Sequence, residues 1–260
     1  MNDIKPESTV SQPLQRPSDP QRRRAGAALI ASGGSYFTAE FIAAAAWTDP
    51  PYSYTHHFIS NLGVHGPATA FGQFMYSPLA WVMNTGFFLF GLAALAGVIM
   101  LRWGHARLFA HAPIDRVRVS RKILRGLPGR RRWPAVAMAA LLAVGGVVLA
   151  FFPGSGEATD NGATDFHGLG AFLGFIGGNV LAILVGRMHQ LLGFTRRLGK
   201  VLVAAGILGL ISIVAYLAVL ASGAGVLIGL VERGIVYPFL IGFIVVGAAL
   251  RKRRIPTRQT

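Results

Sequence analysis

The chain has 260 residues, of which 53% are apolar and only 13% are charged, and it contains no cysteine. The absence of cysteine excludes disulfides and thiolate metal sites. A net charge of +15 can indicate nucleic-acid binding, but that interpretation needs a basic face on a soluble domain. Here the basic residues flank long apolar stretches instead. We therefore expect no nucleic-acid partner, and an anionic membrane leaflet beside the cations.

Residues 1–24 are rich in Pro, Gln, Ser and Arg and end in Arg22, Arg23 and Arg24. Because the segment has no apolar core, it predicts a disordered basic cytoplasmic tail. A cleaved signal peptide would carry its hydrophobic region nearer the start. We therefore expect the first apolar stretch to be retained as a membrane anchor.

Six apolar stretches follow, and a membrane helix needs about 20 mostly apolar residues. They cover residues 25–47, 78–101, 134–152, 168–185, 201–221 and 226–250. The sequence thus predicts an all-α polytopic membrane protein, with a six-transmembrane-helix bundle over 25–250 and a second basic tail at 251–260. Trp47 and Trp133 stand at span ends, where aromatic rings favour the headgroup layer.

The cations predict the orientation of this bundle. Of the 25 Lys and Arg residues, all except Arg233 fall in segments that would share one side: the two tails and the loops 102–133 and 187–200. The loops on the other side, near 48–77, 153–167 and 222–225, carry none. Since Lys and Arg accumulate on the cytoplasmic side, both termini are expected in the cytoplasm and the protein in the plasma or inner membrane.

The inner loop from Arg102 to Arg132 holds ten cations and a single acid. Its apolar residues fall on one face of a possible short helix: Ile114, Val117, Leu124 and Leu127. Such a helix would lie on the anionic inner leaflet. A solvated basic loop that simply obeys the topology rule is the open alternative.

The fourth span carries small residues at every fourth position: Gly170, Gly174, Gly178, Ala182 and Gly186. Small residues at this spacing let a neighbouring helix approach closely, so we interpret them as helix packing and not as a ligand site. The pattern predicts a ridge along one side of a helix that is central in the bundle or lies in the interface of a homo-oligomer.

Several polar residues are expected near the outer end of the bundle. Ionisable groups inside a membrane need a partner or a function. Glu40 and Arg233 each lie about 10 Å below the outer interface on the first and last spans, which predicts an ion pair. Glu232 cannot share the helix face of Arg233. Asn84 lies at a similar depth, and His167 stands at the outer end of the fourth span. This layer is either a structural clamp or the lining of an outward-facing pocket.

The outer loops offer two further constellations. A zinc site can be written from His56, His57, His65, Asp160, Asp165 and His167. No metal-binding spacing supports it, so we expect neither metal nor cofactor. A nucleophilic set of Ser60, His167 and Asp165 likewise lacks a nucleophile elbow.

Five stretches, in order, carry a family resemblance: 52–63 with its Ile59-Ser60-Asn61-Leu62-Gly63 core, Met83-Asn84-Thr85-Gly86, Phe152-Pro153-Gly154, His167-Gly168-Leu169-Gly170-Ala171-Phe172 and Gly229-Leu230-Val231-Glu232-Arg233. On these residues the chain resembles the bacterial and archaeal membrane family called domain of unknown function 998. The resemblance covers about 25–250, except the basic inner loop.

The resemblance implies six helices and no established activity. Position by position, it points at Ser60, Gly63, Asn84, Pro153, His167, Glu232 and Arg233. The family often has an acid after the serine, where this chain has Asn61, so an acid–base role there is not expected. A more distant likeness links the chain to eukaryotic Frag/DRAM-type membrane proteins, which are associated with lipid remodelling.

Three hypotheses follow for function. The first is a non-enzymatic membrane protein whose outer polar pocket binds a lipid headgroup or small ligand, with Glu40, Ser60, Asn61, Asn84, His167, Glu232 and Arg233 lining or bracing it. The second is a membrane-embedded lipid-modifying hydrolase that uses His167 as acid or base. The third is a small transporter, for which paired discontinuous helices would be the signal, and none is seen.

Overall fold

The computed structural model describes residues 19–70, 72–110, 132–154, 163–223, 225 and 227–252. These residues are mostly helical. The long helices are α1 (Asp19–Ala46), α2 (Ala80–Ala110), α4 (Arg132–Phe151), α6 (Ala163–Arg187), α8 (Arg196–Ser222) and α9 (Ile228–Arg251). Shorter elements are the 3₁₀ turn η1 (Ser60–Gly63), the antiparallel hairpin of β1 (Ala68–Ala70) and β2 (Gln73–Met75), and the single turn α7 (His189–Leu192).

Five of these helices, α2, α4, α6, α8 and α9, are long and apolar enough to cross a membrane. The prediction of a mainly helical fold is therefore confirmed, and the five candidate spans indicate a multi-pass membrane protein. Helix α1 covers the remaining predicted span but is more polar, because Glu40, Thr38 and several Ser and Gly residues interrupt its apolar stretch.

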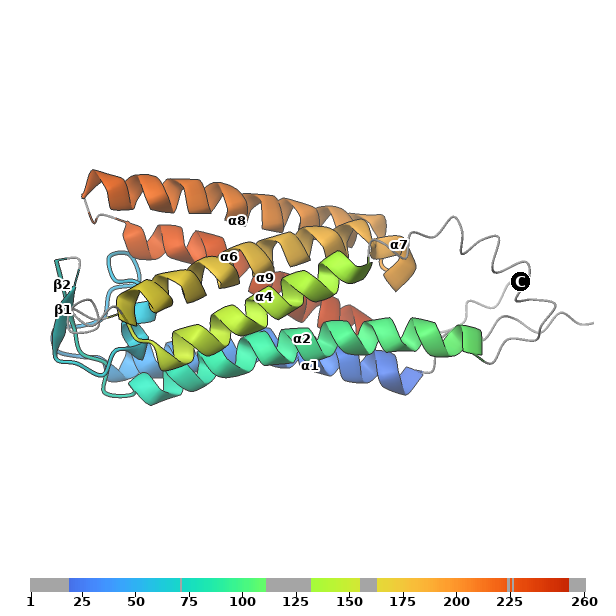
Figure 1. The fold of residues 1–260 in the computed structure, drawn as a ribbon, viewed down its shortest axis with the longest axis horizontal. Helices are drawn as coiled ribbons and strands as arrows, with labels where there is room; N and C mark the ends of the chain where they lie inside the picture. The colour runs from blue at the N-terminus through green and yellow to red at the C-terminus, as the bar shows by residue number, and fades with distance from the viewer. Residues whose placement is uncertain are drawn as a thin grey trace, which may run out of the picture.

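The six long helices form a closed ring in which each packs on the next in chain order and α9 packs on α1. Figure 1 shows them side by side along the long axis of the bundle. Helix α6 also packs against α9 across the ring. Small residues allow these close contacts. A Cβ at Gly145 of α4 would lie 2.6 Å from the carbonyl oxygen of Gly170 on α6, and one at Gly247 of α9 would lie 2.5 Å from the carbonyl oxygen of Gly26 on α1.

The two ends of the bundle differ in charge. The start of α1, the end of α6, the start of α8 and the end of α9 lie at one end, together with α7 (Figure 1). These helix ends carry nine of the described cations: Arg22, Arg23, Arg24, Arg187, Arg196, Arg197, Lys200, Arg251 and Lys252. Three more, Arg102 and Arg107 of α2 and Arg132 of α4, stand near the last residue of α2 and the first of α4. The opposite end holds η1 and the β1–β2 hairpin and has no described Lys or Arg outside α9.

Two predicted boundaries need correction. Helix α1 begins at Asp19, so residues 19–24 are helical and not part of a disordered tail. Pro20 stands in the first turn, where its missing N–H has no helical partner to lose. Helix α2 continues to Ala110, so the first part of the predicted inner loop is also helical. Residues 1–18 and 111–131, including the predicted surface helix, lie outside the described residues.

The prediction that the Trp47 ring lies in the headgroup layer is wrong. Its side chain is only 2% exposed and lies in the core, where the indole stacks on the His57 ring at 5.3 Å and contacts the Tyr52 ring. The outer loop folds back over the end of α1 and covers this side chain. Trp133, in contrast, is 61% exposed at the start of α4.

The small residues of α6 do not form one ridge. A Cβ at Gly170 would contact Val148 of α4, one at Gly178 would contact the Phe239 ring of α9, and one at Gly186 would contact Gly199 of α8. Four residues advance an α-helix by about 400°, so each step moves the row about 40° around the axis. The row therefore winds around the helix and contacts α4, α9 and α8 in turn. These contacts within one chain place α6 centrally in the bundle.

Candidate functional site

Arg233 and Glu40 form the expected ion pair in the interior of the bundle. Arg233 Nη2 lies 2.9 Å and Nε 3.1 Å from Glu40 Oε1. The hydroxyl of Tyr237, one helical turn along α9, donates to the same oxygen at 2.8 Å and accepts from Arg233 Nε at 3.2 Å. The pair ties α9 to α1, as the equal depths of the two residues predicted.

The remaining donors of Arg233 hold the outer loop. Nη1 donates to the carbonyl oxygens of Tyr54 at 2.8 Å and Gly229 at 3.0 Å, and Nη2 donates to the Tyr52 hydroxyl at 2.7 Å. The guanidinium carbon also lies 4.6 Å from the centre of the Tyr54 ring. We call Glu40, Tyr52, Tyr54, Arg233 and Tyr237 the Arg233 clamp. Each guanidinium nitrogen has at least one acceptor, so the clamp has the character of a structural joint.

Tyr52 continues the clamp toward the next part of the loop. Its hydroxyl accepts from Arg233 and donates to the carbonyl oxygen of Phe58 at 3.0 Å. Burial raises the pKa of Tyr52 well above its ordinary value, although the nearby Arg233 charge acts in the opposite direction. The phenol therefore keeps the proton that the bond to Phe58 requires.

Glu232 holds the same loop from another side. Its Oε2 accepts a short hydrogen bond from the Ile59 N–H, next to η1. Between the contacts that Arg233 and Glu232 make, the loop lies so close to α9 that a Cβ at Gly229 would collide with the carbonyl oxygen of His57. Glu232 and Arg233, adjacent in sequence, therefore fix the segment that carries Ser60 and Asn61.

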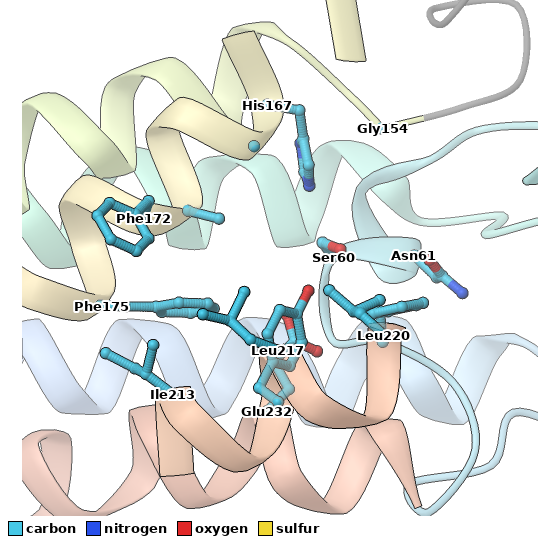
Figure 2. A pocket seen from close by; sticks show the side chains of 14 residues that line it. Ser60, Asn61, Gly154, His167, Phe172, Phe175, Ile213, Leu217, Leu220 and Glu232 are labelled. Carbon is cyan, nitrogen blue, oxygen red and sulfur yellow. The ribbon is translucent and has the colours of Figure 1, made fainter. Parts of the chain in front are cut away.

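This fixed segment forms one wall of a cavity of about 260 Å³ between α6, α8 and α9, which we call the outer cavity (Figure 2). Its lining is largely apolar. Five polar side chains also border it: Ser60, Asn61, His167, Tyr216 and Glu232. Figure 2 shows the His167 ring pointing from the start of α6 toward Ser60, with Glu232 on the far side of the space.

The hydrogen bond of His167 defines what this ring offers the cavity. Nδ1 lies 2.7 Å from the carbonyl oxygen of Phe152, which can only accept, so Nδ1 carries a proton. In the neutral imidazole, Nε2 is then a hydrogen-bond acceptor. The ring also packs on Gly154, where a Cβ would lie 2.9 Å from His167 Cδ2. The Phe152-Pro153-Gly154 turn thus orients His167.

The outer cavity contains acceptors but no cation. No described residue donates to Glu232 Oε1, and no described residue makes a hydrogen bond with the Ser60 hydroxyl. The described residues that line the cavity include no Lys or Arg, because Arg233 turns toward Glu40 instead. A carboxyl oxygen, an imidazole nitrogen and the hydroxyls of Ser60 and Tyr216 therefore border a mainly apolar space.

Exposed apolar side chains of α6 and α8 form part of the lining of the outer cavity, and we assign them as its mouth. Phe172 of α6 and Leu217 and Leu220 of α8 line it and are themselves 49%, 51% and 38% exposed. Both helices are candidate membrane spans. The cavity therefore has a polar end near η1 and an apolar mouth on the surface that would face lipid.

A second, inner cavity of about 20 Å³ lies beside it toward the centre of the ring and shares Ser60, Ala171, Phe175 and Glu232 with it. This volume is enough for about one water molecule. Gly174 lines it and is buried, yet a Cβ there would meet nothing within 4 Å. Glu232 thus borders a small space on its inner side as well.

Asn61 and Asn84 support the loop through their amide nitrogens. Asn61 Nδ2 donates to Gln73 Oε1 of β2 at 2.7 Å, which ties η1 to the hairpin. Asn84 Nδ2 donates to the Gly63 carbonyl oxygen at 3.0 Å, which ties η1 to α2. Gly63 is required for this contact, because a Cβ there would collide with Asn84 Oδ1.

The predicted polar layer is thus divided into two parts by the structure. Glu40 and Arg233 belong to the clamp, whereas Ser60, His167 and Glu232 border the outer cavity. Among the described residues, no group of three or more His, Asp or Glu side chains could hold a metal ion. Asp160 lies outside the described part of the chain, and the side chain of Asp165 is not described.

Sequence analysis missed several polar residues of the interior, of which four tie helices or the outer loop together. Tyr52, Tyr54 and Tyr237 are partners of Arg233. Tyr237 could have been found, because it lies four residues after Arg233 on the same helix face. Asn179 is fully buried in α6 and donates to the Ile235 carbonyl oxygen of α9 at 3.1 Å. An amide within an apolar span was the missed signal.

Comparisons of the chain with protein-family models, curated proteins and solved structures give no match. The resemblance to the family of unknown function therefore stays a prediction. The function therefore has to follow from the Arg233 clamp and from the residues that border the outer cavity.

Proposed function

We propose that this chain is a six-helix protein of the plasma or inner membrane, with both termini in the cytoplasm, and that its outer cavity binds the polar end of a membrane lipid. The observation that carries the proposal is the form of the outer cavity: a polar end at Ser60, His167 and Glu232 and an apolar mouth between two candidate membrane spans. Such a site takes an amphipathic ligand from the bilayer without passage through water.

Charge supports the proposed orientation. The described cations lie at the helix ends opposite η1 and the hairpin, and the cytoplasmic side is the one enriched in Lys and Arg. The outer cavity then faces the outer leaflet. For α1 to be the sixth span, the bilayer must not meet Glu40, and the ring of neighbours buries this carboxylate completely.

The Arg233 clamp supports the same function indirectly. It fixes residues 52–59 to α9, and Glu232 fixes Ile59, so the wall that carries Ser60 is held rigidly. A binding site benefits from such a preorganised wall, since little ordering is left for the ligand to induce. The sequence left the clamp and the pocket as alternatives. In this proposal the clamp holds one wall of the pocket in place.

Native mass spectrometry of the full chain released from a mild detergent tests this function. Gly168 lines the outer cavity, and a Cβ there meets nothing within 4 Å, so Gly168→Leu should fill the cavity without displacing the backbone. Gly34 of α1 is the matched control, because it is equally open but lines neither cavity. We expect a defined lipid mass on the wild type and on Gly34→Leu, and its loss in Gly168→Leu. Equal lipid retention by all three would contradict the proposal.

A second candidate, a membrane-embedded hydrolase, is favoured by one observation. The unprotonated Nε2 of His167 and the hydroxyl of Ser60 border the same cavity, as a general base and a nucleophile would. This function predicts that His167→Gln abolishes turnover of a lipid ester while lipid binding survives. Absence of any turnover by the wild type on lipid esters would leave binding as the function.

A further inference from the structure

The polar end of the outer cavity has a chemical preference that follows from its donors and acceptors. Glu232 Oε1 and, in the neutral ring, His167 Nε2 are acceptors without a described donor. The hydroxyls of Ser60 and Tyr216, which also line the cavity, can either donate or accept. A ligand atom that enters between these groups is matched when it carries a hydrogen-bond donor.

The charges around the outer cavity also favour an uncharged polar group over a phosphate. Among the described residues, no Lys or Arg lines the outer cavity, and the guanidinium of Arg233 is held by Glu40, Tyr52 and backbone carbonyls. A phosphate group placed in the cavity would leave water without gaining a cation, beside the Glu232 carboxyl. Burial of an unpaired charge in an apolar site is strongly unfavourable.

We infer that the outer cavity selects lipids whose polar end is an uncharged hydroxyl group, such as a diacylglycerol or another long-chain alcohol, and rejects phosphate headgroups. The inference rests on the proposed lipid-binding function and adds the chemical class of the ligand. The hydroxyl would donate to Glu232 or His167 and accept from Ser60, while the chains leave between Phe172 and Leu217.

The mouth of the cavity agrees with a ligand of this kind. A hydroxyl is small, so the first carbons of the lipid must also enter the cavity, and its walls there are the side chains of Phe175, Ile213 and Leu217. A zwitterionic or anionic headgroup would instead have to place its charges against these apolar walls.

Matched lipids test the inference. Dioleoylglycerol and dioleoylphosphatidate share both acyl chains and differ in the terminal hydroxyl or phosphate, so their binding to the full chain can be compared by native mass spectrometry. We expect the alcohol to bind at least tenfold more tightly, since about tenfold corresponds to one modest unpaired polar interaction. Equal or tighter binding of the phosphatidate would overturn the inference and leave lipid binding intact.

Controls separate this inference from the proposed function. If neither lipid binds the wild type better than Gly168→Leu, the cavity is not a lipid site and both proposals fall. Glu232→Gln retains an acceptor for the Ile59 N–H and replaces the ionisable carboxyl with a neutral amide. This variant should show a smaller ratio of dioleoylglycerol affinity to dioleoylphosphatidate affinity than the wild type. If this variant does not fold, the wild-type comparison of the two lipids still decides the question.

Discussion

Glu232 and Arg233 are neighbours in sequence, yet they belong to two very different environments. Every nitrogen of the Arg233 guanidinium has an acceptor, from α1, from α9 and from the outer loop. Glu232 has one oxygen fixed by Ile59 and the other facing a cavity without a described donor. A polar group with all its partners serves structure, whereas one that lacks a partner at the edge of a cavity is available to a ligand.

The largest expected effect concerns the Arg233 clamp. Arg233→Leu leaves the Glu40 carboxylate buried without its partner, and loss of one member of a buried pair costs about 3–5 kcal/mol. The double variant Glu40→Leu/Arg233→Leu should recover part of this loss, because neither charge remains. Thermal unfolding in detergent measures both. A double variant that is less stable than Arg233→Leu would show that the ion pair is not the main contribution.

A second pair of variants compares two glycines. Gly229→Ala places a methyl group against backbone of the outer loop and should destabilise the protein by about 1–3 kcal/mol. Gly168→Ala lies beside open space in α6 and should stabilise it by up to about 1 kcal/mol through helix propensity. The melting temperatures should move in opposite directions. A shift of the same sign for both would contradict the close contact between the loop and α9.

The same substitution at the two adjacent positions sharpens the contrast. Glu232→Gln keeps the acceptor for Ile59, so we expect a change in stability of about 1 kcal/mol or less. Arg233→Gln removes the charge and most donors of the clamp and should behave like Arg233→Leu. If Glu232→Gln is as destabilising as Arg233→Gln, Glu232 belongs to the structural joint and not to a site.

The smallest expected effect is a pH dependence at the outer loop. Burial, with the positive charges of His56 and Arg233, lowers the pKa of His57, whose ring stacks on Trp47. The unfolded chain therefore takes up the proton first, and stability should fall as the pH drops below about 6.5, the ordinary value for histidine. His57→Phe retains the stacking and should reduce this fall in melting temperature. An unchanged pH profile in the variant would assign the effect to another group.

Much of this arrangement could be predicted from the sequence, because it depends on hydrophobic length and charge. The six apolar stretches match the six long helices, and the depths of Glu40 and Arg233 predicted their pairing. The separation of Glu232 from Arg233 also followed from helix geometry, since adjacent residues face about 100° apart.

The remainder depends on how the outer loop folds, which has no periodic signal. Tyr52 and Tyr54 reach Arg233, and Trp47 becomes buried, only because residues 48–59 fold back over α1 and α9. The cavity likewise depends on the angle between α6 and α8 and on side-chain volumes at their outer ends. Neither quantity can be read from composition or spacing.

Photocrosslinking with a diazirine-bearing diacylglycerol, followed by mass-spectrometric mapping of the labelled residues, tests the central claim most directly. The account predicts labels concentrated at the mouth of the outer cavity, on Phe172 and Leu217, in the wild type and in Gly34→Leu, and their loss in Gly168→Leu. Labels spread evenly over lipid-facing residues elsewhere, such as Leu89 of α2, and unchanged by Gly168→Leu would contradict it.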